Sequence, residues 1–109
     1  MDMQELQETI KGRKIRPAHP GEVLADILED VEMSQTAFAE RLGVSRRTIN
    51  EIVQGRRPVS VDMAIRLGQS LGNGPQLWLN LQQTVDIWDA FQSNGEAYNK
   101  LSKIPELAC

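Results

Sequence analysis

One stretch, SQTAFAERLGVSRRTINEIVQGRR (Ser34–Arg57), constrains the fold more than any other part of the 109-residue chain. Ser34 and Ser45 are of the kind that caps helix N-termini, and each precedes a short run of apolar residues at helical spacing. Gly43, between these runs, can adopt the left-handed conformation that ends a helix. The pattern therefore predicts two short helices joined by a tight turn, a helix-turn-helix. Helices this short need further helices around them to be stable.

Each of the two predicted helices has an apolar stripe that would face a core. The stripes consist of Ala37, Phe38 and Leu42 in the first helix and of Ile49, Ile52 and Val53 in the second. The second stripe follows the i, i+3, i+4 spacing of an amphipathic helix. Gly55 and then Pro58 follow it, and this order predicts that the second helix stops there.

The opposite face of the second helix is rich in polar side chains, at about 100° per residue. Its residues are Arg47, Glu51 and Gln54 at the centre, flanked by Arg46, Asn50 and Thr48. Arginine, asparagine and glutamine have donors and acceptors that match purine edges in the major groove of DNA. The alternative is an ordinary solvated helix face. DNA recognition is favoured, because helix caps, a glycine stop and a donor-rich face coincide in one motif.

Charge is distributed unevenly along the chain, whose net charge is −3 at pH 7. Residues 34–57 hold five arginines and two glutamates, which gives a local charge of +3. Residues 1–33 hold four basic and eight acidic residues, which gives a local charge of −4. Local charge sets the potential that a phosphate backbone meets. The acidic total therefore does not exclude a nucleic-acid partner.

Three further helices are predicted around the helix-turn-helix, so the expected fold is all-α with five helices. The first opens at His19–Glu22, where a proline suits the first helical position and a glutamate the first turn. Ser60 caps another, and Pro75 starts the longest, which is expected to end at about Gln92. The inward positions are Val23, Leu24, Ile27, Leu28 and Val31 in the first helix, Met63, Ala64, Leu67 and Leu71 in the second, and Trp78, Leu81, Val85 and Trp88 in the third.

The longest predicted helix has more apolar surface than one packing stripe needs, because Ile87 and Phe91 lie beside that stripe. A five-helix domain of this size is not expected to cover so wide a surface, so part of it is predicted to contact a second copy. The candidate dimer interface consists of Trp78, Leu81, Val85, Ile87, Trp88 and Phe91. The alternative is that these side chains belong to the core of a single chain.

The chain divides into an N-terminal extension (1–14), a helix-turn-helix domain (15–92) and a C-terminal tail (93–109). The basic segment Lys11–Pro17 is either an arm along DNA phosphates or a solvated tether. In the tail, four apolar residues have the spacing of a short amphipathic helix broken near Pro105. They are Tyr98, Leu101, Ile104 and Leu107.

Little in the chain suits catalysis or metal binding. His19 is the only histidine, so it has no second histidine with which to share such a role, and it is interpreted as a helix-terminus residue. Cys109 is the only cysteine and is interpreted as a frayed terminal residue rather than a reactive thiol or an intermolecular bridge. We therefore expect no enzyme, cofactor or metal site. No apolar run has membrane-spanning length and the first residues lack a signal-peptide pattern, so a cytoplasmic location is expected.

Three motifs of the sequence resemble a known family: IRPAHPGEVL, SQTAFAERLGVSRRTINEIVQGRRPVSVDMAIRLGQSLG and WLNLQQTVDIW. The middle motif resembles the helix-turn-helix of the phage-repressor (Xre) class. The outer motifs narrow the resemblance, over about residues 15–91, to the HigA-type antitoxins, also called virulence-associated protein I. The resemblance implies a five-helix, lambda-repressor-like domain and a homodimer joined through its C-terminal helices. It also implies a palindromic DNA operator, repression of the antitoxin's own operon, and a small mRNA-cleaving HigB-type toxin as partner.

The resemblance also implies roles for residues of the helix-turn-helix. Base-reading positions are Arg46, Arg47, Asn50 and Glu51. Positions that contact or brace the DNA backbone are Ser34, Gln35, Ser45, Thr48, Gln54, Arg56 and Arg57. Glu51 is unusual among them, because phosphate repels a carboxylate unless it accepts from a cytosine amine or pairs with Arg47.

Two alternatives to an antitoxin remain open. One is a stand-alone Xre-type regulator without a toxin, which the same sequence features fit. The other is a protein-interaction module that no longer binds DNA. Five arginines around an intact recognition face weigh against this second alternative.

Overall fold

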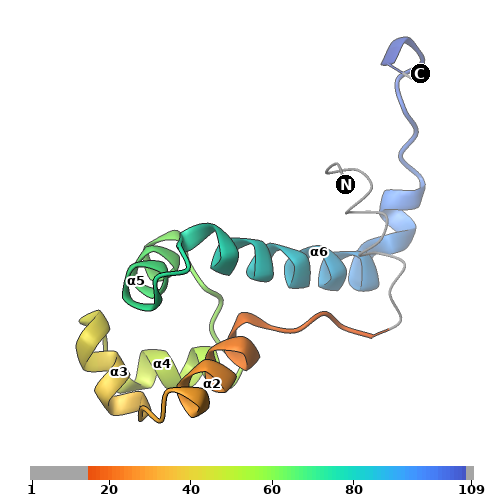
Figure 1. The fold of residues 1–109 in the computed structure, drawn as a ribbon. Helices are drawn as coiled ribbons and strands as arrows, with labels where there is room; N and C mark the ends of the chain where they lie inside the picture. Colours follow the sequence, from red (N-terminus) through yellow and green to blue (C-terminus); the bar gives the residue numbers. More distant parts are fainter. Residues whose placement is uncertain (1–14, 108–109) are drawn as a thin grey trace.

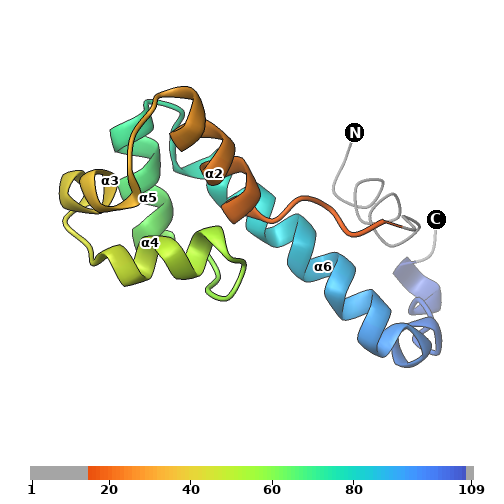
Figure 2. The same ribbon diagram turned by 90° about the horizontal axis from the view of Figure 1, so that it is seen from below.

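The computed structural model describes residues 15–107, and this part of the chain is all-helical (Figure 1). Its elements are α2 (Pro20–Asp30), α3 (Gln35–Leu42), α4 (Arg46–Val53), α5 (Val61–Leu71), α6 (Pro75–Asn99) and a short 3-10 helix, η1 (Pro105–Leu107). The first four helices gather at one end, and α6 extends away from them (Figures 1 and 2). The predicted all-α fold with five helices is confirmed for the described residues. The predictions for residues 1–14 and for Cys109 lie outside them.

Serine caps start three of the helices as predicted. Each hydroxyl oxygen accepts a hydrogen bond from the backbone N–H three residues later, at 3.1 Å for Ser34 and Ser45 and 3.2 Å for Ser60. These bonds satisfy donors that the first turn of a helix leaves without a partner. Gly43 ends α3 in the left-handed conformation, with φ 71°, so the sharp turn between α3 and α4 needs no strained side chain.

A capping box starts α2 at His19. Its Nδ1 accepts a hydrogen bond from the Gly21 N–H at 2.9 Å, and the Glu22 carboxylate accepts one from the His19 N–H at 2.9 Å. His19 is 6% exposed. Burial, and then the nearby Arg16, lower its pKa below the ordinary value. The interpretation of His19 as a helix-terminus residue is confirmed.

One apolar core lies between the helices. Its buried members are Leu24, Leu28, Phe38, Ala39, Leu42, Ile49, Ile52, Val59, Met63, Ala64, Leu67 and Trp78. Two predicted inward positions are wrong. Ala37 is exposed, and the buried alanine of α3 is Ala39. Val31 is 54% exposed, because it caps the C-terminus of α2 beyond the last packed turn.

Two glycines allow backbone segments to approach closely. A Cβ on Gly21 would overlap the carbonyl oxygen of Ile52, where the start of α2 meets the end of α4. A Cβ on Gly68 would overlap the backbone of Gly74 and Pro75, where α5 meets the turn before α6. The first contact fixes the start of α2 against α4, the second helix of the predicted helix-turn-helix.

The longest helix runs beyond its predicted end at Gln92. It continues to Asn99 and bends at Asn94, whose backbone (φ −130°, ψ 21°) is not helical. Neither a proline nor a left-handed glycine follows Gln92, so nothing in the chain stops the helix there. After the bend, the Tyr98 ring meets the Phe91 ring edge-on, with 5.2 Å between the ring centroids.

The predicted amphipathic helix of the tail is wrong. Tyr98 belongs to α6, residues 101–104 have no regular structure, and η1 spans only Pro105–Leu107. The other three residues of that predicted stripe are exposed: Leu101, Ile104 and Leu107. None of the helices within residues 15–107 has the length and hydropathy that a membrane span requires.

The described end of the basic segment lies against α6. The Arg16 guanidinium donates two hydrogen bonds to the Asp89 carboxylate, from Nε to Oδ1 and from Nη2 to Oδ2, each 2.9 Å long. The hydrogen bonds from Arg16, together with the positive charge of its guanidinium, lower the pKa of Asp89. Arg16 is thus held by α6, some way along the chain from the helix-turn-helix.

Candidate nucleic-acid interface

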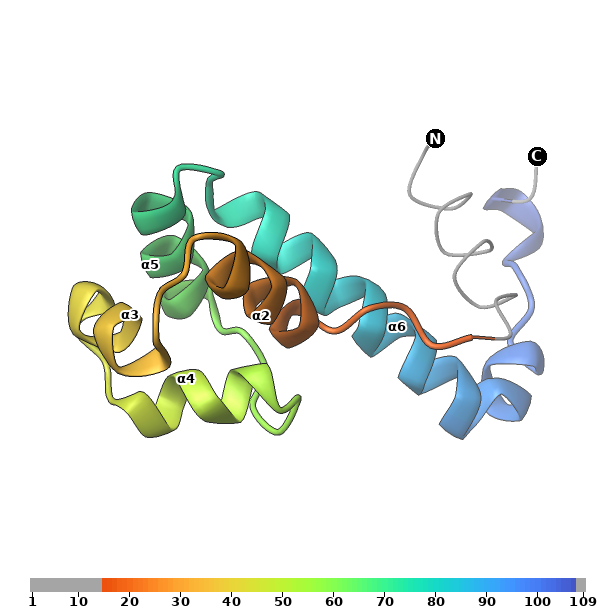
Figure 3. The same ribbon diagram turned by 60° about the horizontal axis from the view of Figure 1, so that its bottom comes forward.

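Helix α4 lies at the edge of the helical cluster (Figure 3). Ile49 and Ile52 are both 0% exposed and anchor its apolar face in the core. Arg46, Arg47 and Gln54 are exposed. Burial of the apolar face therefore fixes which side chains α4 offers to a partner, and these are the donor-rich ones that the sequence singles out.

The two helices of the helix-turn-helix are tied together by polar side chains. The Asn50 side-chain amide donates to Gln35 Oε1 at 3.1 Å, across fifteen residues of sequence. Gln35 is the first residue of α3, so this bond holds the start of α3 beside the middle of α4. Ser45 Oγ, which caps α4, also lies 2.9 Å from Thr48 Oγ1. These four side chains are half-buried or engaged in caps, which limits their freedom before any ligand arrives.

Glu51 joins two arginines from different segments. Its Oε1 accepts a hydrogen bond from Arg47 Nε at 2.7 Å, and its Oε2 accepts one from Arg57 Nε at 2.9 Å. These two bonds, Arg47 first, lower the pKa of Glu51. The sequence offers Glu51 two partners, a cytosine amine or Arg47, and the structure shows the pairing with Arg47.

The Arg57 contact could not be read from helical spacing, because Arg57 follows the end of α4. Gly55 takes a left-handed conformation with φ 75°, and the loop turns back over the helix. The backbone N–H groups of Arg56 and Arg57 then both donate to the Glu51 carbonyl, at 2.8 and 3.2 Å. In the sequence, the signal for this fold-back is Gly55, a residue that can adopt the left-handed conformation, followed by two arginines.

The predicted site residues lie on three neighbouring segments: the start of α3, helix α4 and the loop after it. The structure therefore brings both groups, the base-reading and the backbone-bracing positions, to one side of the domain. Arg56 is exposed in the loop, at the edge of this surface. Which of these residues contact bases and which contact phosphates stays a prediction.

The candidate dimer interface on α6 needs correction at two positions. Trp78 is 0% and Val85 1% exposed within the single chain, so neither can offer surface to a second copy. The Trp78 indole N–H also donates to Asn73 Oδ1 at 2.9 Å. Trp78 belongs to the apolar core between the helices, and Val85 is buried farther along α6, which packs against α5 and α2. The remaining members of the predicted interface are half-buried: Leu81, Ile87, Trp88 and Phe91.

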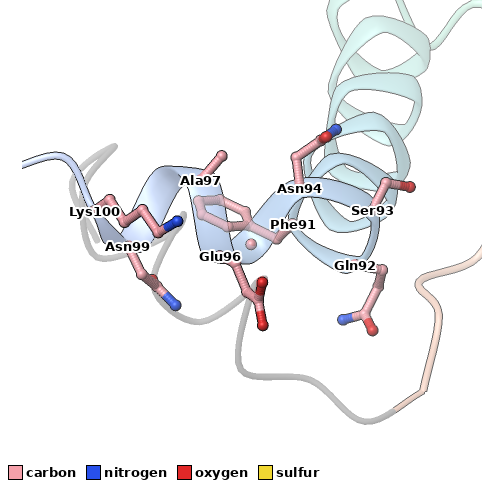
Figure 4. Close-up of a pocket in the computed structure, with 9 residues that line it drawn as sticks. Phe91, Gln92, Ser93, Asn94, Glu96, Ala97, Asn99 and Lys100 are labelled. Carbon is pink, nitrogen blue, oxygen red and sulfur yellow. The ribbon is translucent and has the colours of Figure 1, made fainter.

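A shallow pocket lies at the bend of α6 (Figure 4). It is lined by Phe91, Gln92, Ser93, Asn94, Gly95, Glu96, Ala97, Asn99 and Lys100. Most of these side chains are exposed and polar, so the pocket is not an apolar ligand site of the usual kind. Within residues 15–107, no group of three or more histidine, cysteine, aspartate and glutamate side chains is placed to hold a metal ion.

The fold and the exposed polar face of α4 define a helix-turn-helix protein of the repressor type. The helix-turn-helix family matches residues 24–78. Antitoxin HigA-1 of Vibrio cholerae is 40% identical over 77 residues, which cover 70% of this chain and 72% of that protein. The chain belongs to the HigA-type antitoxins of this helix-turn-helix family.

Two solved structures extend the comparison. One, from Nostoc punctiforme, is of a proposed antidote protein of a plasmid maintenance system. It is 57% identical, with a TM-score of 0.73, and the match covers 83% of this chain and 99% of that chain. The other is the Pseudomonas aeruginosa antitoxin HigA with the higBA promoter, at 40% identity and a TM-score of 0.77, covering 82% of this chain and 99% of that chain. The resemblance of the three sequence motifs to HigA-type antitoxins is confirmed.

Proposed function

We propose that this protein is a DNA-binding antitoxin that represses its own operon and neutralises a small mRNA-cleaving toxin of the HigB type. It acts in the cytoplasm, binds double-stranded DNA as a homodimer at a palindromic operator, and catalyses no reaction. The observation that carries the proposal is the donor-rich face of α4, exposed on a domain that matches a HigA antitoxin solved with its promoter.

Helix α4 has the dimensions and polarity of a recognition helix. A helix fits the major groove of B-DNA, and arginine and asparagine side chains can each make two hydrogen bonds to a purine there. Arg46 and Arg47, in its first turn, extend into solvent. In this family of motifs, the N-terminal residues of the second helix contact base edges. Arg56 and Arg57, in the loop that follows α4, are proposed to contact the phosphate backbone.

A single helix-turn-helix makes too few contacts for tight and specific binding. Two copies related by a two-fold axis would place their recognition helices about one helical turn, ~34 Å, apart on a palindromic operator. The half-buried apolar residues of α6 that remain candidates for the dimer contact support this arrangement. Arginine–phosphate contacts release counterions, so binding should weaken steeply as salt concentration rises.

The test begins with selection from a library of random DNA duplexes, read out by mobility shift across a salt series. The proposal expects a palindromic consensus and binding by a dimer. The logarithm of the association constant should fall linearly with the logarithm of the salt concentration. Binding by a strictly monomeric protein, or affinity that does not change with salt, would contradict it. A failure to select any sequence would favour the protein-interaction module.

The antitoxin role needs a second experiment, because a stand-alone regulator would pass the first. The open reading frame beside this gene is expressed with and without the antitoxin, and growth and mRNA integrity are followed. A neighbouring protein that degrades mRNA and arrests growth only in the absence of this chain supports the toxin–antitoxin pair. A harmless neighbour would leave a transcription regulator without a toxin.

A further inference from the structure

Glu51 is the inner member of a three-residue ionic cluster on the candidate DNA surface. Its Oε1 lies 2.7 Å from Arg47 Nε, and its Oε2 lies 2.8 Å from Arg57 Nη2 and 2.9 Å from Arg57 Nε. The Glu51 side chain is 22% exposed, whereas that of Arg47 is 86% exposed. The carboxylate is therefore set back, and the arginine extends beyond it.

This arrangement does not suit a base-reading carboxylate. To read cytosine, a carboxylate has to direct an oxygen at the amino group in the major groove. Both oxygens of Glu51 instead accept from guanidinium groups. Arg47 donates to Glu51 through Nε, which leaves its terminal nitrogens available to a ligand, and its side chain is 86% exposed. Terminal nitrogens of a guanidinium can pair with the O6 and N7 of guanine.

We propose that Glu51 is a positioning residue that sets the specificity of DNA binding through Arg47 and Arg57 and does not itself contact a base. This inference rests on the proposed operator binding, and it replaces the expected base-reading role of Glu51. Holding Arg47 by its Nε removes rotamer freedom before the DNA arrives, so less is lost on binding. Holding Arg57 keeps the loop after α4 folded back on the helix.

The charge of the cluster gives Glu51 a second effect. Two arginines and one carboxylate sum to a charge of +1, and without the carboxylate the charge would be +2. Additional positive charge strengthens binding to any duplex, whatever its sequence. Specificity is the difference between binding the correct and the incorrect sequence. Because the added attraction acts on preferred and other duplexes alike, the charge of Glu51 sets how strongly any duplex is bound, whereas its hold on Arg47 sets the difference between them.

The experiment compares the wild type with Glu51→Gln, which keeps the shape of the side chain and removes its charge. The probes are the preferred duplex from the random-library selection and a scrambled duplex of equal length. In Glu51→Gln, affinity for the scrambled duplex should rise several-fold, and its salt dependence should steepen by about one unit of logarithmic slope. The ratio of the two affinities should fall about tenfold. Preference should weaken at the same base pair that Arg47→Ala affects.

Glu40→Gln is the matched control, because it makes the same charge change on exposed α3, and no ion pair within residues 15–107 includes Glu40. It should leave the ratio of affinities unchanged. The double variant Arg47→Ala with Glu51→Gln should discriminate no worse than Arg47→Ala alone, since Glu51 acts through Arg47. Thermal unfolding followed by circular dichroism checks that each variant folds. Glu51→Asp, which keeps the charge but is one methylene too short to hold both arginines, should relax the same base pair and replaces Glu51→Gln should that variant fail to fold.

Three outcomes would overturn the inference. A changed preference at a base pair other than that of Arg47 would make Glu51 a base-reading residue. An equal loss of affinity for both duplexes would make its role purely structural, and unchanged affinities would leave it with none. If the wild type itself selects no sequence, the proposed function fails. If the wild type selects a sequence and Glu51→Gln has the same ratio of affinities for the preferred and scrambled duplexes, this inference is refuted and the proposed function stands.

Discussion

Arg47 and Arg57 share the Glu51 carboxylate, yet they lie on different parts of the candidate DNA surface. Arg47 is on the exposed face of α4, and Arg57 follows the left-handed Gly55. A side chain on the recognition helix reaches base edges, whereas a loop beyond that helix meets the sugar–phosphate backbone. At the scale of single residues, we therefore predict a base-reading role for Arg47 and a backbone-anchoring role for Arg57.

This division predicts different effects of two alanine substitutions. Arg47→Ala should cost about 1–3 kcal/mol on the preferred duplex and relax the preference at one base pair. Arg57→Ala should weaken binding to all sequences similarly and lower the salt slope by about one. Both are measured by fluorescence anisotropy on preferred and scrambled duplexes. Equal loss of discrimination in the two variants would refute the division. Arg46, also exposed, could share the base-reading role, and Arg46→Ala tests this in the same assay.

His19 predicts how stability depends on pH. Its Nδ1 must stay unprotonated to accept the Gly21 N–H bond, and its pKa is lowered from the ordinary 6.5. As pH falls below 6.5, the unfolded chain therefore binds a proton at His19 before the folded chain does, and the free energy of unfolding decreases until pH passes the folded pKa. The lowered pKa values of Glu51 and Asp89 act at lower pH, below their ordinary 4.5 and 3.8.

The measurement is urea unfolding between about pH 5 and 7.5, where the His19 effect is expected. His19→Asn is the control, because an asparagine oxygen can cap the helix and does not titrate. Stability should fall toward the acidic end in the wild type and stay nearly level in His19→Asn. A slope of the same size in both proteins would show that other groups cause it.

At the scale of elements, what the sequence predicts well is what short-range chemistry controls. The serine caps at Ser34, Ser45 and Ser60 act within one helical turn, so their hydrogen bonds follow from local spacing. The predicted end of α6 at Gln92 is wrong because no stop signal stands there, and the bend at Asn94, beyond which the Tyr98 ring meets Phe91, has no local sequence pattern.

The candidate site shows the same limit. The polar face of α4 follows from helical periodicity, and the structure bears out that it is exposed. The Asn50–Gln35 and Glu51–Arg57 bonds depend on how α3 and the loop after α4 are placed in space, and no local pattern encodes that placement. Trp78 falls in both the predicted core stripe and the predicted dimer interface, because periodicity shows which face is apolar but not what covers it; the structure places it in the core.

The contact between α2 and α4 gives a prediction at this scale. Gly21→Ala should lower the free energy of unfolding by about 1–3 kcal/mol or more, because its Cβ meets backbone that cannot rotate away. Gly95→Ala is the control. Nothing lies within 4 Å of its Cβ position in α6, so it should raise stability by about 0.4–1 kcal/mol. Chemical denaturation measures both, and a Gly21→Ala protein as stable as the wild type would show that α2 does not approach α4 so closely.

At the scale of the whole molecule, α6 extends beyond the cluster that carries the DNA surface (Figure 2). Its first part is core, since Trp78 and Val85 are fully buried within the chain. Farther along, Ile87 and Phe91 are half-buried beside the bend. A helix that is core at one end and apolar at the other can join two copies without disturbing either helix-turn-helix.

Phe91→Asp tests whether this part of α6 joins the dimer that a palindrome needs. An aspartate buried in a dimer contact without a partner costs several kcal/mol, so the protein should become monomeric. Each monomer should stay folded, because the buried core lies in the other part of the domain. Operator binding should collapse with the dimer, although every residue of the candidate DNA surface is unchanged. Light scattering and a mobility shift on the same sample measure both effects.

The control for Phe91→Asp is Gln92→Asp, which places the same charge on the neighbouring exposed position of α6. Gln92→Asp should remain dimeric and bind DNA as the wild type does. Phe91→Asp also removes the contact between the Phe91 and Tyr98 rings within one chain. Tyr98→Asp tests whether losing that contact is enough to break the dimer, because it removes the other ring. If only the dimer contact matters, Tyr98→Asp keeps more of the dimer than Phe91→Asp. A Phe91→Asp protein that is still fully dimeric would move the interface to the segment before Pro17 or to the tail after Ser93.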